Sequence, residues 1–386
     1  MTAIESSNPR PILVFATKGT GSNEEDRIKA LVSGHDFRLL TYDKQAKWVS
    51  FCGLLRVFRT TGPSLIVMEG TGIAGGLACM IGRFLFGHRY VVSSGDAVGP
   101  YVGSHYAILG PVFGVYERLL CRWSAGFIGW TPYLVGRALT FGAPRGMTAP
   151  GWVIGKQVED YADSRRRVRE KWGLPEKTIV FGIAGAIIWS KRRRYCYGLE
   201  LVRAIRRVRR DDLAVVIIGD GSGIEHLRRE AGSDLNNRVL LPGRVPLDEV
   251  MENLCGFDVA SLPQSTDGVG SFRYTTKISE YRQINLPIVT TRIPAAYDLD
   301  LGHCWRLPGE NPWDDRFVGA LAELMDHLSL SELDQVNSHQ WCGSDRIFDR
   351  DEQIARAGEF FEDMVAKQIQ RKSALGVARC VIQGFV

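Results

Sequence analysis

The sequence lacks the features that mark secreted, metal-stabilised or membrane-spanning proteins. Its eight cysteines form no C-x-x-C pair, and their scatter favours reduced, mostly buried thiols over disulfides or a zinc site. The first ten residues are polar and contain no signal-peptide core. The longest uncharged run, residues 97–116, contains four glycines and two prolines, which makes a poor spanning helix. We therefore expect a cytoplasmic protein without a transmembrane anchor.

Net charge is also small. The 386 residues include 48 Lys and Arg against 43 Asp and Glu, a formal charge of +5 that does not by itself imply nucleic acid. An apolar fraction of 45% excludes global disorder, and the length favours two domains. The charge is unevenly spread, because residues 163–210 hold 15 Lys and Arg against four Asp and Glu. We call residues 163–210 the basic segment.

What is present is a repeated alternation of apolar strands, glycine turns and helical patterns. This alternation predicts parallel sheets covered on both faces. The predicted strands are residues 11–16, 64–68, 89–93, 125–130, 178–183, 213–218, 238–241, 258–262 and 287–291. A Gly- and Pro-rich stretch at residues 142–151 interrupts the pattern. The sequence therefore predicts two α/β halves with a linker near residues 145–175.

Three short motifs allow a functional or an ordinary structural interpretation. Residues 70–75 (GTGIAG) have the G-x-G-x-x-G form of a dinucleotide site, but the same glycines would permit tight helix–sheet packing, which we favour. Gly19 and Gly21 follow the first strand, where backbone N–H groups could face a phosphate or sugar, and Asn23 is predicted to cap the next helix. The D-x-D at residues 298–300 could hold a metal, although turn chemistry explains it equally well.

Residues 257–291 carry the most specific pattern. A strand ends at Leu262-Pro263, a glycine loop follows at residues 268–270, and Lys277-Ile278-Ser279-Glu280-Tyr281 precedes a strand that begins at Leu286-Pro287. Upstream, residues 216–221 (VIIGDG) and 239–245 (VLLPGRV) appear in the matching order. This arrangement resembles the nucleotide-sugar half of GT-B glycosyltransferases, particularly the retaining enzymes of glycosyltransferase family 4. The resemblance is looser over residues 125–143.

The resemblance implies an α/β GT-B architecture, with two Rossmann-like doubly wound domains facing each other across a cleft. Residues 1–150 would form the acceptor domain and residues 151–350 the nucleotide-sugar domain. A C-terminal helix, expected at residues 351–367 within the segment 351–386, would cross back to the first domain. The implied activity is retaining transfer of a hexose from a nucleotide-diphosphate sugar to a glycan, lipid-linked or small-molecule acceptor. No metal or other cofactor is implied.

The resemblance also assigns donor-binding residues. Glu280 would accept hydrogen bonds from the ribose hydroxyls, and a surface ion pair with Lys277 or Arg273 is the alternative. Arg244 and Val245 would line the base. Backbone N–H groups of the loop around Gly268, Gly270 and Ser271 would approach the diphosphate or the sugar, and Asp267 is a candidate sugar contact.

Three departures from the family pattern bear on catalysis. The usual Arg after the first strand of the nucleotide-sugar domain is replaced by Ala186, so we expect Lys191 or Arg192, with Arg273 or Lys277, to neutralise the leaving diphosphate. Phe272 stands where the family often has a first Glu. The loop after residues 89–93 has Asp96 in place of a His, so Asp96 becomes a candidate to hold the donor sugar or the acceptor. His105 is expected to cap a helix or lie in the core.

Three other functions remain open at this point. They are a nucleotide-sugar epimerase of related fold, a non-catalytic nucleotide-sugar-binding subunit and a nucleic-acid binder, although no nucleic-acid recognition module is visible.

Four arginines are predicted to share one helix face, namely Arg203, Arg206, Arg207 and Arg210. That face could meet anionic lipid at the inner face of a membrane, or it could simply be solvated.

Overall fold

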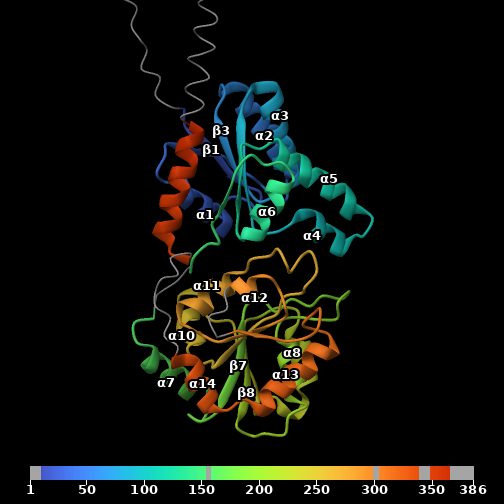
Figure 1. Cartoon of the computed structure of the whole chain (residues 1–386), viewed down its shortest axis with the longest axis vertical. Coiled ribbons are helices and arrows are strands. Elements are labelled where there is room, and N and C mark those ends of the chain that lie inside the picture. Colours follow the sequence, from blue (N-terminus) through green and yellow to red (C-terminus); the bar gives the residue numbers. More distant parts are fainter. Residues whose placement is uncertain (1–9, 154–157, 299–303, 339–347, 366–386) are drawn as a thin grey trace, which may run out of the picture. The chain divides into compact units, whose positions relative to one another are not determined.

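The computed structural model describes residues 10–153, 158–298, 304–338 and 348–365, which form two compact units (Figure 1). The first unit contains the described residues up to Gly151, the short segment Phe272–Tyr274 and residues 348–365. The second unit contains the described residues from Trp152 to Ser271 and from Thr275 to residue 338. The predicted fold class is confirmed, since each unit is an α/β structure around a parallel sheet of six strands.

The sheet of the first unit has the order β2-β1-β3-β4-β5-β6. Its strands are β1 (Ile12–Ala16), β2 (Phe37–Leu39), β3 (Leu65–Glu69), β4 (Arg89–Ser94), β5 (Gly126–Gly129) and β6 (Gly146–Thr148). The helices are α1 (Asn23–Leu31), α2 (Lys47–Thr60), α3 (Ile73–Phe86), α4 (Val98–His105), α5 (Leu109–Arg122) and α6 (Pro132–Thr140). A further helix at residues 350–365 belongs to this unit, where Asp363 accepts a 2.8 Å hydrogen bond from Arg145.

The sheet of the second unit has the order β12-β11-β10-β7-β8-β9. Its strands are β7 (Ile179–Ala184), β8 (Leu213–Ile218), β9 (Val239–Gly243), β10 (Val259–Leu262), β11 (Ile288–Thr290) and β12 (Cys304–Arg306). The helices are α7 (Tyr161–Trp172), α8 (Leu199–Ile205), α9 (Ile224–Ala231), α10 (Val250–Leu254), α11 (Thr276–Gln283), α12 (Ala295–Asp298), α13 (Asp315–His327) and α14 (Leu330–Ser338), with 3-10 turns at Gly232–Asp234 and Leu247–Glu249.

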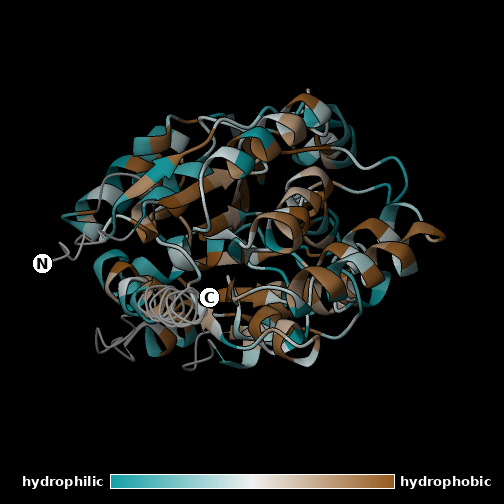
Figure 2. Cartoon of the chain, turned by 90° about the horizontal axis from the view of Figure 1, so that it is seen from above, coloured by the Kyte–Doolittle hydropathy of each residue, from teal (hydrophilic) through white to brown (hydrophobic). Residues whose placement is uncertain are grey.

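Each unit has its own apolar core. Strands such as β1, β3, β7 and β8 are buried along their whole length, as the side chains of a central parallel strand must be. In Figure 2 the strands are mostly brown, whereas the helices carry both colours, as amphipathic covering helices do. The six described cysteines are free thiols, and four of them are buried, in agreement with the sequence prediction.

The glycines at residues 70–75 serve packing. A Cβ at Gly75 would lie 2.8 Å from the Phe15 ring and 3.1 Å from Met68 Sδ, and a Cβ at Gly72 would lie 2.9 Å from Thr17 Cβ. The start of α3 therefore approaches strands β1 and β3 more closely than any other residue type would allow. This close packing is the interpretation that the sequence favoured over a dinucleotide site.

Two local predictions are wrong. Ser22, not Asn23, caps α1, since the Ser22 hydroxyl accepts a hydrogen bond from the Glu25 N–H. Helix α8 ends at Ile205, so Arg206, Arg207 and Arg210 do not continue the helical face that begins with Arg203. The chain turns after Ile205 because Val208 returns into the core at 4% exposure before β8 begins.

Candidate functional site

The order of the second sheet creates a natural ligand site. Strands β7 and β10 are parallel neighbours, but the chain leaves β7 toward β8 on one side and leaves β10 toward β11 on the other. Loops that depart in opposite directions leave a crevice at the carboxyl ends of the two strands, where open α/β sheets bind ligands. The residues that follow β7 and β10 are therefore the candidates for ligand binding.

A cation lies at the end of β7. Lys277, from α11, reaches so close to Gly185 that a Cβ on Gly185 would lie 2.7 Å from the Lys277 Nζ. The same ammonium lies 4.9 Å from the centre of the Tyr197 ring, at cation–π distance. The absence of a side chain at Gly185 is thus what allows the ammonium to approach the backbone at the switch point.

The first turn of α11 adds polar groups beside this ammonium. Thr275 precedes the helix, and its hydroxyl is buried without a hydrogen-bond partner among the described residues. Glu280 lies one turn after Lys277, and burial raises the pKa of Glu280 above its ordinary value, while Lys277 and a hydrogen bond with Thr276 oppose that rise. A helix N-terminus, an ammonium and an unpaired hydroxyl favour an anionic group.

A buried hydrogen-bond network supports α11 and β10. The Tyr281 hydroxyl donates to the Ser261 carbonyl at 3.2 Å, which ties α11 to β10. The Ser261 hydroxyl donates to Glu200 at 2.8 Å, and the Tyr195 hydroxyl donates to the same carboxylate at 2.7 Å. Burial raises the pKa of Glu200, and these hydroxyl donors oppose the rise. Sequence analysis missed this network, because its members lie far apart in the chain.

The ends of β7, β8 and β9 also converge. The Gly219 N–H donates to the Gly243 carbonyl at 2.8 Å, and a Cβ at Gly219 would collide with the Gly185 carbonyl. Arg244 and Val245, the predicted base contacts, directly follow Gly243, and Arg244 is exposed whereas Val245 is half-buried. The second unit therefore carries Arg244, Val245, Lys277 and Glu280 on loops and a helix that follow its central strands.

The glycine loop after β10 is organised by Asp267. Its carboxylate accepts hydrogen bonds from the Val269 N–H at 2.9 Å, the Gly270 N–H at 3.0 Å and the Ser265 hydroxyl at 2.8 Å. Although partial burial acts to raise it, the pKa of Asp267 is lowered by these three donors and by the charge of Arg193. Gly268 is exposed, and the Ser271 hydroxyl donates to the Thr266 carbonyl at 2.9 Å. Asp267 thus fixes the loop conformation and occupies two of its N–H groups.

Lys191 and Arg192 lie in a tight loop after β7. Ser190 and Tyr195 pair across its base, with the Ser190 N–H donating to the Tyr195 carbonyl at 2.9 Å. Both predicted cations are exposed at this loop, and Lys191 lines a cavity between α8 and α9. Of the cations proposed for the diphosphate, Lys277 is the one that lies against Gly185 at the end of β7.

The other two predicted catalytic residues meet in the first unit. The Arg273 Nε donates to the Asp96 carboxylate at 2.8 Å, and the Arg273 guanidinium lies 5.9 Å from the Tyr101 ring. Gly19 and Gly21 line a cavity of about 940 Å³ in this unit, beside Lys18 and the start of α2. The Gly21 N–H already donates to Glu25 at 3.2 Å, which reduces the donors that this loop can offer to a ligand.

A buried ion pair that the sequence did not reveal braces the first sheet. Arg27 of α1 donates to Glu69 at 2.7 Å, to Ser93 at 3.0 Å and to the Ala149 carbonyl. Burial raises the pKa of Glu69, and Arg27 opposes that rise. These partners follow or end β3, β4 and β6, so Arg27 links the carboxyl ends of three strands. The sequence indicates this pair only through Glu69, a charged residue at the end of the otherwise apolar strand LIVME.

The structure also bears on the predicted metal motif, on His105 and on a membrane-spanning helix. Residues 299–303, which include the second half of the D-x-D, lie outside the described residues. Within the described part of the chain no cluster of three or more His, Cys, Asp or Glu could hold a metal ion. His105 is exposed in the last turn of α4, where its Nδ1 lies 3.0 Å from the Tyr101 carbonyl. Among the described helices none is both long and apolar enough to cross a bilayer.

Solved structures of similar fold include a sucrose-phosphate synthase, a glycosyltransferase and a protein described as an epimerase. Sucrose-phosphate synthase from Thermosynechococcus elongatus superimposes with a TM-score of 0.65 at 13% identity, over 93% of this chain and 100% of that one. WaaG, a glycosyltransferase involved in lipopolysaccharide biosynthesis, gives 0.62 at 11% identity, over 90% and 99%. A Listeria monocytogenes protein described as a UDP-N-acetylglucosamine 2-epimerase gives 0.53 at 12% identity, over 92% and 97%. At such identities the likeness concerns the fold.

Sequence comparison points to the second unit. A search of curated proteins finds no match to this chain. Residues 178–327 match the family model described as "Glycosyl transferases group 1". These residues include β7, β10 and α11, and hence Gly185, Lys277 and Glu280. The second unit therefore carries a domain that matches a glycosyltransferase family.

Proposed function

We propose that the protein is a glycosyltransferase that moves a hexose from a nucleotide-diphosphate sugar to a glycan, lipid-linked or small-molecule acceptor with retention, as in family 4. The observation that carries this proposal is the Lys277 ammonium against Gly185, at the switch point of a sheet whose sequence matches glycosyl transferases group 1. Glu280 and the unpaired Thr275 hydroxyl on the same helix support it.

The reaction needs stabilisation of a leaving group more than a proton donor. The bond between the sugar C1 and the diphosphate oxygen breaks, and its electron pair stays on that oxygen. The acceptor oxygen bonds to C1 on the same face, and its proton passes to the departing phosphate. Lys277 and the N-terminus of α11 would stabilise the growing negative charge, and Glu280 would hold the ribose. No metal is invoked in this assignment.

Binding and turnover test the proposal in sequence. A thermal-shift screen with UDP, GDP, dTDP and their sugars identifies the donor, and release of free nucleotide then measures transfer or hydrolysis. Lys277→Gln should lower kcat about 100-fold, the effect of removing one preorganised charge from a transition state. Glu280→Gln should weaken nucleotide binding about tenfold. The control is Lys171→Gln at the exposed end of α7. Wild-type rates in both Lys277 and Glu280 variants would refute the site assignment.

Two alternatives are separated by the same assays. A nucleotide-sugar-binding subunit is suggested by Phe272 and Asp96 at positions where the family often has Glu and His, and it would bind the nucleotide sugar without releasing nucleotide. An epimerase, suggested by the fold of the Listeria protein, would convert the sugar of the donor in the absence of any acceptor. Chromatography of the nucleotide sugar after incubation with the protein alone identifies that outcome.

We further propose a peripheral contact with anionic lipid through α5, which would place the protein at the inner face of a membrane. Ile108, Val112 and Val115 share one helical face and are 90%, 61% and 59% exposed. Arg118 and Arg122 continue this face one and two turns later, and both are exposed. Apolar side chains followed by cations match the boundary between the acyl region and anionic headgroups.

Vesicle co-sedimentation tests this contact. We expect the protein to bind vesicles that contain phosphatidylglycerol and to bind pure phosphatidylcholine vesicles much less. Val112→Gln together with Val115→Gln should abolish the binding, while Val49→Gln, a change at a valine of α2 that is even more exposed, should not. Equal sedimentation of all three proteins would remove α5 from the proposal, and no sedimentation of the wild type would remove the membrane contact.

A further inference from the structure

A second cation-rich hollow lies in the second unit, away from Lys277. It has a volume of about 570 Å³, within the range of small-molecule sites, and lies between α8 and α9 beside the tight loop after β7. Its positively charged lining residues are Lys191, Arg194, Arg203, Arg206 and Arg229. We call these five residues the cavity cations.

Acidic side chains balance little of this charge. Glu230 is the one carboxylate in the lining, and it lies 3.4 Å from the Arg203 Nε and 3.9 Å from Arg206. Arg229 donates to neutral partners, the Glu225 carbonyl and the His226 ring. Lys191 and Arg194 form no ion pair with any described residue. Five positive charges therefore face one negative charge, an arrangement that an anionic ligand would relieve.

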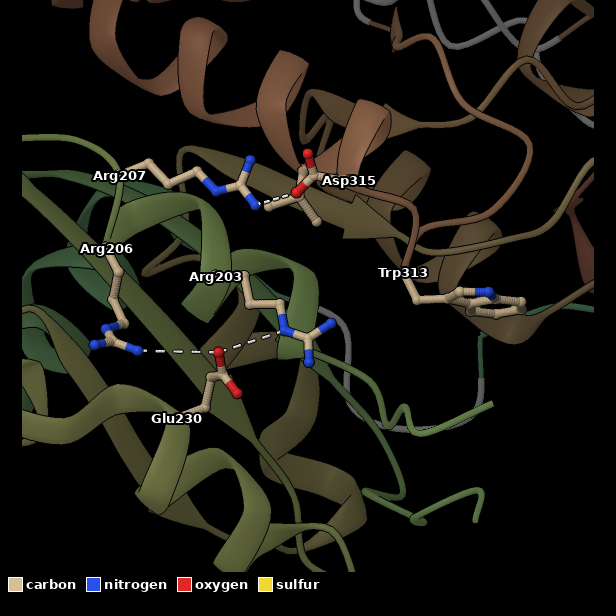
Figure 3. A pocket seen from close by; sticks show the side chains of 7 residues that line it. Arg203, Arg206, Arg207, Glu230, Trp313 and Asp315 are labelled. Carbon is tan, nitrogen blue, oxygen red and sulfur yellow. Dashed lines mark hydrogen bonds and ion pairs between the residues drawn. The ribbon is translucent and has the colours of Figure 1, made fainter. Parts of the chain in front are cut away.

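The hollow continues into a neighbour. Arg203, Arg206 and Glu230 also line an adjoining hollow of about 370 Å³ that reaches Trp313. Figure 3 shows Arg203 and Arg206 directed toward Glu230, while Arg207 is directed toward Asp315 instead. The two hollows thus share a floor of two guanidinium groups. Such a floor suits a ligand that carries more than one phosphate, since guanidinium groups bind phosphate oxygens in pairs.

A ring stack and a hydrogen bond join the loop after β7 to the start of α9. The Trp189 and His226 rings stack with their centres 3.6 Å apart and their planes at 4°, and the Trp189 backbone N–H donates to the Ser222 hydroxyl at 3.1 Å. These contacts hold the loop after β7 against α9. The backbone that carries Lys191 and Arg194 is thereby placed beside Arg229 of α9.

We propose that the cavity cations form a binding site for a small soluble ligand with two or more phosphate groups, separate from the donor site. This site goes beyond the proposed transferase activity. Residues 185–198 connect the two sites, because Gly185 and Tyr197 at the ends of this segment contact Lys277, while Lys191 and Arg194 near its middle line the hollow. Occupation of the hollow would fix this segment and so alter nucleotide binding at Lys277.

Calorimetric titration of the full chain with pyrophosphate tests the proposal. We expect two binding events in the wild type. Arg206→Gln combined with Arg229→Gln should weaken one of them at least tenfold, and Lys277→Gln should weaken the other. The matched control is Arg228→Gln. Arg228 neighbours Arg229 in α9, but it pairs with Glu225 and does not line the hollow. Wild-type binding by the double variant would overturn the second site, whereas wild-type binding by Lys277→Gln would overturn only the donor site.

Two further measurements keep the outcome clear. Arg194→Asn changes an exposed loop residue whose φ of +50° asparagine tolerates, so this variant should fold and should lose binding at the same event as the double variant. Vesicles that contain cardiolipin present paired phosphates on a lipid. The soluble ligand is supported if the wild type binds pyrophosphate and does not bind these vesicles. It is overturned if the wild type does not bind pyrophosphate but binds the vesicles, and if the change of Arg206 and Arg229 abolishes vesicle binding.

Discussion

Two groups of cations in the basic segment differ in how many acceptors they have. In the first group, Arg165 and Arg169 of α7 both pair with Asp258, at the start of β10. Arg169, only 5% exposed, also donates to the carbonyls of Glu176 at 3.0 Å and Thr178 at 2.9 Å. These guanidinium groups have several acceptors each, and they fasten α7 to the amino end of the central strand β10.

Around the hollow between α8 and α9, acceptors are scarce. Arg203 and Arg206 share Glu230 at distances longer than a good hydrogen bond, and Lys191 and Arg194 have no ion pair with any described residue. The share of Lys and Arg is similar in the two stretches, six of 15 at residues 163–177 and nine of 20 at residues 191–210. What differs is the number of acceptors that the fold brings to each arginine, and this number decides between a structural brace and a binding surface.

Removal of Asp258 should have the largest effect on stability. Asp258→Asn leaves two largely buried guanidinium groups without their carboxylate, which should lower the free energy of unfolding of the second unit by about 3–5 kcal/mol. Urea denaturation followed by circular dichroism measures this loss. Asp163→Asn is the matched control, because Asp163 pairs with Arg166 and Arg167 at the surface of the same helix and should cost about 0.5 kcal/mol. Equal losses of unfolding free energy in both variants would show that the buried pairs of Asp258 stabilise the unit no more than the surface pairs of Asp163.

Much of the fold was predictable because buried parallel strands leave long apolar runs. All nine predicted strands are present, with ends shifted by a residue or two. The three strands that were not predicted, β2, β6 and β12, have three residues each and lie at or beside sheet edges. Strand β6 lies within the Gly- and Pro-rich stretch at residues 142–151, and a Cβ at Gly146 would collide with Val135. Gly146 contributes to the Gly- and Pro-rich composition that predicted a linker, yet in the structure it allows β6 to pack closely against α6.

The candidate site was predictable in its residue types but not in its pairings. The spacing of the motif selected Glu280 and Lys277, since both lie on one short helix. It could not tell which cation meets the end of β7, because Gly185 and Lys277 are 92 positions apart and meet only through the β7–β10 pairing. Arg210 illustrates the same limit. It was predicted to share a helical face with Arg203, but its side chain donates to Asp212 and to carbonyls at the end of α13.

Glu200 is a third case within the basic segment. It is a buried carboxylate whose side-chain partners among the described residues are two hydroxyl groups rather than a cation. Burial raises the pKa of Glu200 in the folded state above the value of about 4.3 expected in the unfolded chain. The folded state therefore binds the proton more tightly, and stability falls as the pH rises from the unfolded pKa through the folded pKa. In Glu200→Gln this decline should disappear. Urea denaturation at several pH values between 4.5 and 8 measures it, and an unchanged pH dependence would contradict the assignment.

Glu230→Gln should have the smallest effect on stability and the opposite effect on binding. Glu230 is partly exposed and makes two long ion pairs, so its loss should change the free energy of unfolding by about 0.5 kcal/mol or less. The same change removes the one negative charge from the lining of the hollow, and pyrophosphate should therefore bind several-fold more tightly. Calorimetry and urea denaturation of the same preparation measure both quantities. A loss of stability comparable to that of Asp258→Asn, or weaker pyrophosphate binding, would mean that the arginines around Glu230 form a brace like the one at α7.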